Sequence, residues 1–196
     1  MTAKMTDSDL RKAVRQKIIR KGVLDPETLV VEELGVNHGR NRIDIAVVSD
    51  KLHGYELKSD SDNLLRLPSQ AKAFSAIMDK VTLVVGSAHA QPAIAIVPQW
   101  WGVKVAYQGV RGGIRISTER RAINNPSIDP FELLKLVWKD EAILLLSQKI
   151  KVDWRTKSLR KKELYQLIVE NFTTEEVRGS VREILTSRID WRSATS

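Results

Sequence analysis

The sequence predicts an α/β fold, in which a mixed β-sheet flanked by helices occupies residues 1–125 and a helical C-terminal extension occupies residues 126–196. Short runs rich in β-branched residues, typical of strands, are concentrated in the first part. Helical spacing of apolar residues replaces them after Asp129-Pro130. The 196 residues, 42% of them hydrophobic, are enough to bury one substantial core, so a disordered chain is not expected.

The first part should begin with a helix and continue into strands. Apolar residues at helical spacing predict a helix over about residues 8–21, and its cations, Arg11 and Arg15 among them, are expected to face solvent. A β-branched run predicts the first strand over residues 28–34. Two further strands, joined by a polar turn, are expected within residues 42–58 as a hairpin.

A helix and three short buried strands are expected next. The helix should start near Pro68, because proline suits a first helical turn and breaks a helix interior. Nearly continuous apolar runs predict strands over residues 81–85 and 93–97, and a further strand is expected over residues 103–107. The pair Trp100-Trp101 precedes the last strand, and such a pair either stacks on bases or fills an edge of the core.

The C-terminal extension is predicted to be helical. In chain order it contains a largely buried helix over about residues 129–148, a basic connection over 149–160, a helix over 164–172 and a helix capped by Thr173 and Glu176. The last two could form a helix-turn-helix, but Glu175-Glu176 is a poor start for a helix that approaches phosphates. We therefore expect them to pack on the sheet domain or on a second copy of the chain, which makes a homodimer a candidate assembly.

Charge and composition restrict the class of partner. The formal net charge is +8 and the sequence pI is about 9.8, which suits a polyanion such as nucleic acid. The absence of cysteine excludes disulfides and thiolate metal sites. No signal peptide and no apolar run long enough for a membrane span are recognisable, so a cytoplasmic location and no membrane partner are expected.

Three charged residues lie inside the otherwise apolar hairpin. Glu56 and Lys58 are two residues apart and therefore share one face of their strand, and Asp44 can lie opposite them on the neighbouring strand. Charges on a central strand must pair or bind a metal. The pattern alone fits either a divalent-metal site or a structural ion pair.

This hairpin resembles that of the PD-(D/E)XK nuclease superfamily, RecB-like members in particular. Asp44 matches the family aspartate, Glu56 the variable acid and Lys58 the lysine, while Ile43 replaces the proline. The following helix is also similar, with Asp62, Arg66-Leu67, Gln70, and Phe74 in place of the usual tyrosine. Across most of the chain, from Glu33 to Trp101-Gly102, then residues 136–141 and Trp191-Arg192, the sequence resembles a family of small bacterial and phage proteins within this superfamily.

The resemblance implies a restriction-endonuclease-like core and hydrolysis of phosphodiester bonds, in DNA rather than RNA, with Mg²⁺ or Mn²⁺ as cofactor. The implied catalytic residues are Asp44, Glu56, Lys58 and Gln70. Asp44 and Glu56 would hold the metal, and Glu33 and the backbone carbonyl of Leu57 would assist. Strand alternation does not decide whether Glu32 or Glu33 faces it.

Arginines beside the hairpin are candidate contacts for nucleic acid. The loop that carries Arg40 and Arg42 could grip a phosphate or be a merely exposed connection, and Arg66 could reach Asp62 or a phosphate. Gln70 could orient water or Lys58, or act as a surface glutamine. The main alternative to a nuclease is a non-catalytic nucleic-acid-binding or scaffold protein with the same fold.

Overall fold

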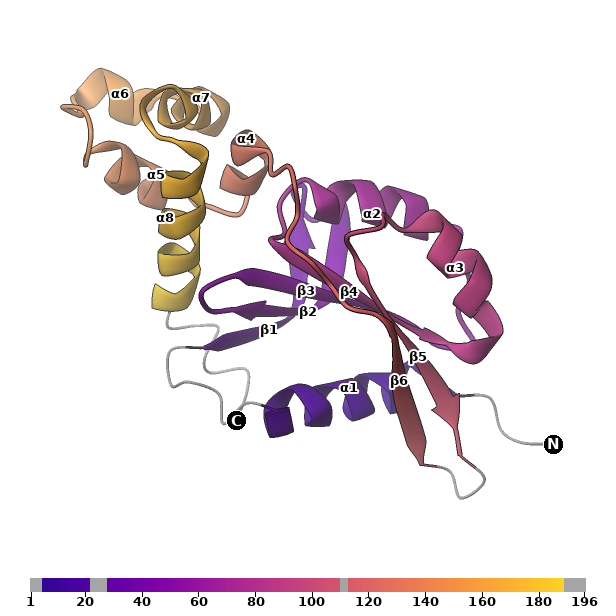
Figure 1. Ribbon diagram of the computed structural model, residues 1–196. Helices are drawn as coiled ribbons and strands as arrows, with labels where there is room; N and C mark the ends of the chain where they lie inside the picture. The colour runs from indigo at the N-terminus through magenta and orange to yellow at the C-terminus, as the bar shows by residue number, and fades with distance from the viewer. Residues whose placement is uncertain (1–4, 22–27, 110–112, 189–196) are drawn as a thin grey trace.

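A single six-stranded sheet forms the centre of the molecule, in the spatial order β1-β2-β3-β4-β5-β6 (Figure 1). The computed structural model describes residues 5–21, 28–109 and 113–188, without the side chains of residues 18–21. In chain order the strands are β1 (Leu29–Val36), β2 (Asn41–Val48), β3 (Leu52–Lys58), β4 (Lys80–Gly86), β5 (Gly102–Gln108) and β6 (Ile114–Arg120). The expected hairpin is confirmed as β2 and β3. Trp191 and Arg192 lie outside the described residues.

The sheet is mixed, as the sequence predicts. Pairing is antiparallel from β1 to β3, parallel from β3 to β5, and antiparallel between β5 and β6. Strand β6 was not predicted, because its residues are half-buried or exposed and include no apolar run. Main-chain pairing with β5 holds this segment as a strand, although its side chains show no strand pattern.

Helices provide the crossovers that the parallel strands require. Helix α2 (Leu67–Ser75) links β3 to β4 and has proline in its first turn, as expected. A short 3₁₀ turn, η1 (Ser87–His89), and helix α3 (Ala90–Ile96) link β4 to β5. The predicted strand over residues 93–97 is therefore wrong, since a strand there could not return the chain to start β5 parallel to β4.

Each face of the sheet is covered by its own hydrophobic cluster. Helix α1 (Asp7–Lys21), predicted correctly, packs Leu10 and Val14 against Leu57 and Val84 on one face. Helices α2 and α3 cover the other face (Figure 1). Trp101 is fully buried there and its indole N–H donates to Ser75 Oγ at 3.2 Å, so it fills the core.

The C-terminal region contains five helices within the residues described, which end at 188. They are α4 (Pro130–Leu134), α5 (Lys139–Leu146), α6 (Trp154–Ser158), α7 (Lys161–Asn171) and α8 (Thr174–Ser187). The predicted single helix over 129–148 is interrupted, because Trp138 caps α5 and its N–H donates to the Glu141 carboxylate at 2.6 Å. Helix α6 lies within the predicted connection. The capping box of Thr173 and Glu176 starts α8, as expected.

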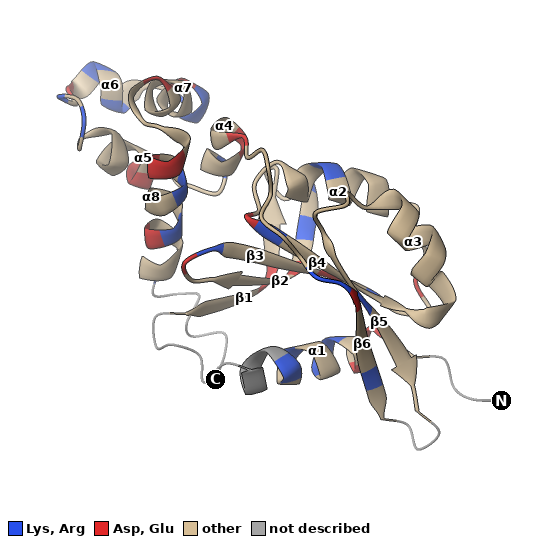
Figure 2. Ribbon diagram, viewed as in Figure 1, with Lys and Arg blue, Asp and Glu red and all other residues tan. Residues whose placement is uncertain are grey.

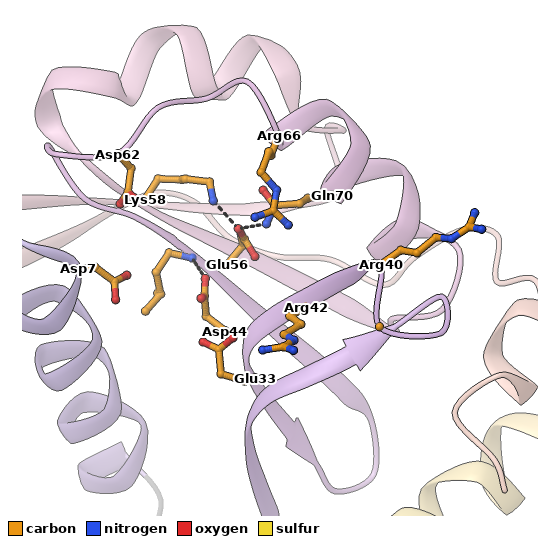
Figure 3. Close-up of a pocket in the computed structure, with 12 residues that line it drawn as sticks. Asp7, Glu33, Arg40, Arg42, Asp44, Glu56, Lys58, Asp62, Arg66 and Gln70 are labelled. Carbon is orange, nitrogen blue, oxygen red and sulfur yellow. Dashed lines mark hydrogen bonds and ion pairs between the residues drawn. The ribbon is translucent and has the colours of Figure 1, made fainter.

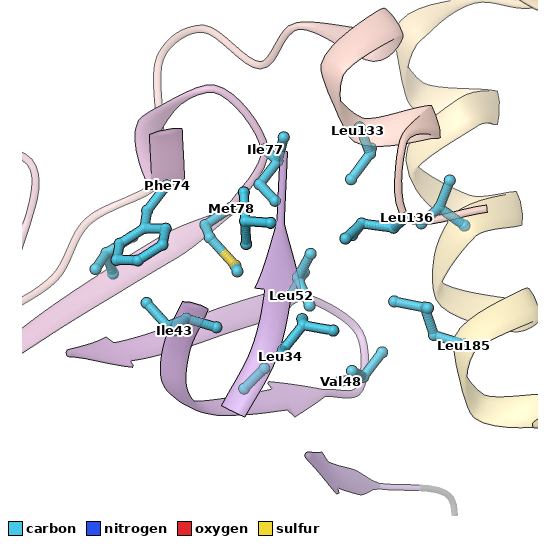
Figure 4. Close-up of a cluster of buried hydrophobic side chains, with 14 of the residues drawn as sticks. Leu34, Ile43, Val48, Leu52, Phe74, Ile77, Met78, Leu133, Leu136 and Leu185 are labelled. Atoms are coloured by element: carbon cyan, nitrogen blue, oxygen red, sulfur yellow. The ribbon is translucent and has the colours of Figure 1, made fainter. Parts of the chain in front are cut away.

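Helix α8 and its neighbours pack on the sheet rather than standing apart as a helix-turn-helix. Leu133, Leu136 and Leu185 join the same buried cluster as Val48 and Leu52 of the hairpin (Figure 4). The sheet and the C-terminal helices thus share one core, and the division at residue 125 stays a prediction. None of the helices in the described ranges is long and apolar enough to cross a membrane.

A buried carboxylate ties α8 to the hairpin. Asp79, 3% exposed, accepts from Leu52 N at 2.7 Å and forms ion pairs with Arg178 and Arg182 of α8. Burying one carboxylate between two guanidinium groups is stabilising only while all partners are present.

We expect Asp79→Ala to lower the free energy of unfolding by about 3 kcal/mol, because it leaves buried donors without an acceptor. Urea unfolding would measure the change. Glu175→Ala is the matched control: Glu175 also pairs with Arg178 but is 69% exposed, so its loss should cost under ~1 kcal/mol. Equal losses of unfolding free energy in the two variants would contradict the interpretation that Asp79 holds α8 to the hairpin.

The imidazole of His53 makes the fold sensitive to acid. Its Nε2 lies 2.9 Å from Thr82 Oγ1 and its ring stacks on Tyr55. The pKa of His53 falls from 6.5 to about 4, chiefly because of burial and also because of the charges of Lys80 and Lys104. The folded state therefore favours the neutral ring, so stability present above pH 6.5 is lost as the pH falls towards 4.

His53→Gln should remove this acid dependence, which amounts to at most about 3 kcal/mol. Unfolding free energies measured between these two pH values would show it. The exposed His38 provides the control, because His38→Gln should leave the slope unchanged. The interpretation fails if wild type and His53→Gln lose stability in parallel.

Candidate functional site

The candidate site lies where β2 and β3 separate. Their pairing runs only from Val48 and Leu52 at the turn to Ile45 and Tyr55. Beyond that point the start of β2 pairs with β1 alone, and the end of β3 pairs with β4 alone. We call the opening between residues 41–44 and residues 56–58 the fork.

A cavity of about 420 Å³ occupies the fork. The structure brings every predicted site residue to its lining: Glu33, Arg40, Arg42, Asp44, Glu56, Leu57, Lys58, Arg66 and Gln70. Asp62, Asp7 and Gly39 line it as well. Figure 3 shows α1 on one side of the cavity and the start of α2 on the other.

Asp44 holds the fork in shape. Its Oδ2 accepts from the Leu57 N–H at 2.7 Å, where a regular ladder would place a backbone carbonyl. Its Oδ1 accepts from Arg11 at 2.8 Å. Burial raises the pKa of Asp44, and the Leu57 N–H and the Arg11 charge act against this rise.

Arg11 is the residue that sequence reasoning missed. One guanidinium nitrogen lies 2.8 Å from both Asp44 and Glu33, so the expectation that Arg11 faces solvent is wrong. Helical periodicity placed it on the polar face of α1 but could not show that this face lies over the fork. Two carboxylates separated by 11 residues in sequence are thus bridged by a guanidinium group.

The conformation of the backbone places Glu33, rather than Glu32, at the fork. Glu33 has φ of +55°, and the β1–β2 register omits it between the pairs Glu32–Ile45 and Leu34–Ile43. This left-handed conformation breaks strand alternation. Glu33 consequently lies beside Asp44, whereas Glu32 pairs with Arg15 at 3.3 Å.

Glu56 is the most deeply buried acid of the site, with 1% of its surface exposed. Its Oε1 accepts from Lys58 Nζ and from Gln70 Nε2, both at 2.6 Å (Figure 3). Burial raises the pKa of Glu56 to about 8, and the Asp44 charge adds to the rise. Glu56 Oε2 and Gln70 Oε1 are buried without a hydrogen-bond partner among the described residues.

The charges at the fork are unevenly paired. Each of its acids accepts a hydrogen bond or lies beside a cation, Asp62 through Ser59 and Asp7 through Arg11. Arg40, Arg42 and Arg66 are exposed, and their side chains make no ion pair or hydrogen bond with another described residue. Arg66 therefore does not pair with Asp62. The opening therefore holds three guanidinium groups without a partner in the described residues, whereas three of its acids share the one charge of Arg11.

The described part of the chain contains no group of three or more His, Cys, Asp or Glu side chains that could hold a metal ion. Arg11 takes the position between Glu33 and Asp44 that a cation would need. The two unpartnered oxygens of Glu56 and Gln70 do suit a hard cation. The predicted metal ligands, including the Leu57 carbonyl, and the predicted catalytic roles remain predictions.

Comparison with known proteins identifies a phage relative. The family described as Bacteriophage P4 protein cII matches residues 1–195. Protein cII of Enterobacteria phage P4 is 28% identical over 148 residues, which cover 76% of this chain and 55% of that protein. The chain thus spans about half the length of the curated relative it matches. No solved structure matches the chain.

These matches correct the predicted function. The family that matches nearly the whole chain is that of a phage cII protein, and neither description names a nuclease or another enzyme. The expectation of a metal-dependent nuclease that hydrolyses DNA is therefore wrong. Membership of the PD-(D/E)XK superfamily is not supported, whereas the resemblance to phage proteins is confirmed. The α/β fold is confirmed, whereas the more specific prediction of a restriction-endonuclease-like core is not.

Proposed function

Since the chain belongs to the family of Bacteriophage P4 protein cII, we propose that it binds nucleic acid at the fork without cleaving it. The observation that carries this proposal is the set of three exposed, unpaired guanidinium groups at the opening, contributed by Arg40, Arg42 and Arg66. DNA is the expected form of the ligand. A homodimer remains a prediction.

The placement of the arginines supports a phosphate ligand. Arg42 lies on the β2 side of the fork and Arg66 near the start of α2 on the other, whereas the side chain of Arg40 points outward from the rim (Figure 3). A guanidinium group donates several hydrogen bonds in one plane, which matches the oxygens of a phosphodiester. A backbone phosphate held between Arg42 and Arg66 would lie over Glu56, whose charge Lys58 offsets.

The charge of the whole chain acts in the same direction. An excess of eight positive charges attracts a polyanion at long range and favours rapid association. Phosphate contacts of this kind position a protein on nucleic acid but carry no direct information on base sequence. The proposal is therefore of backbone binding at the fork.

Arg42→Ala and Arg66→Ala should each weaken binding of a short labelled DNA duplex and reduce the slope of log affinity against log salt by about 1. Fluorescence anisotropy over a range of NaCl concentrations would measure both quantities. Arg121→Ala is the control, because Arg121 is exposed just after β6 at the opposite edge of the sheet.

Unchanged affinity in both fork variants, or a loss no greater than that of the control, would place the nucleic acid elsewhere. The DNA should also be recovered intact after incubation with protein and Mg²⁺. Shortened DNA, absent in a Lys58→Ala variant, would overturn the non-enzymatic assignment.

We also propose Mg²⁺ or Mn²⁺ as a ligand of the fork, held by Asp44 and Glu56. Two buried oxygens without a donor, Glu56 Oε2 and Gln70 Oε1, support this proposal, because such groups are costly to bury unpaired. When bound, the ion would supply positive charge for a phosphate oxygen. Arg11 already compensates Asp44, so guanidinium and metal ion would compete for that carboxylate.

This competition predicts that Arg11→Ala tightens Mn²⁺ binding, by roughly tenfold, because it frees two carboxylates from a charge in direct contact. Asp44→Asn should weaken it. Calorimetric titration of the protein without nucleic acid measures both. Arg15→Ala is a matched control on the same helix, since Arg15 pairs with Glu32 outside the cavity lining. Mn²⁺ binding that is indifferent to Asp44 and Arg11 would remove the metal from the fork.

A further inference from the structure

Helix α6 carries an exposed tryptophan that belongs neither to the hydrophobic core nor to the lining of the fork. The side chain of Trp154 is 73% exposed, although tryptophan is usually among the better-buried residues. It is the one apolar residue of the helix, whose sequence is Trp-Arg-Thr-Lys-Ser. The guanidinium of Arg155 lies 5.4 Å from the centre of its indole. An aromatic surface therefore stands in solvent, beside a cation.

Cations surround this tryptophan. Residues 149–162 contain seven Lys or Arg side chains, and Figure 2 shows this charge on α6 and at the start of α7. Lys149 pairs with Glu176, and Lys161 donates to the Val137 carbonyl. The other five make no ion pair with any residue in the described ranges: Lys151, Arg155, Lys157, Arg160 and Lys162. We call Trp154 together with these five cations the α6 platform.

The acids at positions 153 and 163 cap helices and form no ion pair with these five cations in the described structure. Asp153 accepts from Thr156 N at 2.9 Å and caps α6, while Glu163 accepts from Arg160 N at 2.7 Å and caps α7. Both carboxylates are thus held by helix N-termini. A groove of about 590 Å³ lies beyond α6, lined by Leu159, Arg160 and α7 side chains that include Lys162, Glu163 and Glu170. Trp154 does not line it, so the platform consists of an aromatic face and cationic side chains, of which Arg160 and Lys162 reach the groove.

We propose that the α6 platform binds single-stranded nucleic acid, stacking an unpaired base on Trp154 while the cations contact the adjoining phosphates. Aromatic stacking between cationic side chains is the arrangement that single strands require, because every base has a π-face and every linkage a charge. This inference rests on the proposed function, since it adds a second contact for the same class of ligand.

A lipid surface fits the platform less well. Helices that lie in a membrane interface need an extended apolar face. Helix α6 has five residues and one apolar side chain, so it offers a single anchor. In a duplex, the bases are stacked on one another and their faces are closed to an indole. The chemistry thus selects an unpaired strand over both lipid and duplex.

The test compares a labelled oligothymidylate with a short duplex in fluorescence anisotropy, using the full chain. Trp154→Ala should weaken binding of the single strand by roughly tenfold and that of the duplex by less than about twofold. Trp154→Phe should retain most of the affinity, because it keeps an aromatic face. Leu144→Ala is the matched control, since Leu144 is 69% exposed on α5 but belongs to no such cluster.

The outcomes separate this inference from the proposed function. If Trp154→Ala binds both ligands as wild type does while Arg66→Ala weakens the duplex, the α6 platform is overturned and the fork stands. If Trp154→Ala weakens the single strand while the fork variants change nothing, the platform stands and the fork falls. Binding of neither ligand by wild type overturns both. Sedimentation with phosphatidylglycerol vesicles that depends on Trp154, with single-strand binding unchanged, would replace the inference by a lipid contact.

Discussion

The structure of the site depends on one hydrogen bond, that between the Asp44 carboxylate and the Leu57 N–H. Strands β2 and β3 could pair along their whole length only if a backbone carbonyl met that N–H. The side chain takes its place, so the strands part without leaving a buried donor unpaired. The fork and its cavity follow from this substitution. The remaining oxygen of Asp44 faces Arg11, which fixes α1 over the opening.

At the fork, the charged residues of the sequence pattern interact with one another inside the fold. The ammonium of Lys58 and the amide of Gln70 both donate hydrogen bonds to one carboxylate oxygen of Glu56. Glu33 and Asp44 share a guanidinium group. Asp7 pairs with the same guanidinium group, so three carboxylates share one positive charge, while Lys58 offsets Glu56. The arginines at the opening are the cations of the fork that have no partner among the described residues.

Much of the fold could be predicted, because the spacing of apolar residues along the chain reflects local secondary structure. The hairpin, the proline-started α2 and the capped α8 all have signals within a few residues. The run at residues 93–97 was assigned as a strand because short apolar runs have no period, and only the parallel pairing of β4 with β5 requires a helix there. Every predicted site residue lines the fork, yet the function inferred from them was wrong. Their types and spacing could not reveal Arg11, which comes from a distant helix.

Helix α6 lies at the outer end of the C-terminal helices, away from the sheet (Figure 1). The ion pair between Asp79 and Arg178 and the shared hydrophobic core hold those helices against the hairpin. The separation between the fork and the α6 platform is therefore set by the fold rather than by a linker. If both proposed contacts are made, affinity should depend on the length of the strand. A strand too short to reach both places would gain from one contact alone, and a longer strand would gain from the effective concentration that the first contact creates at the second.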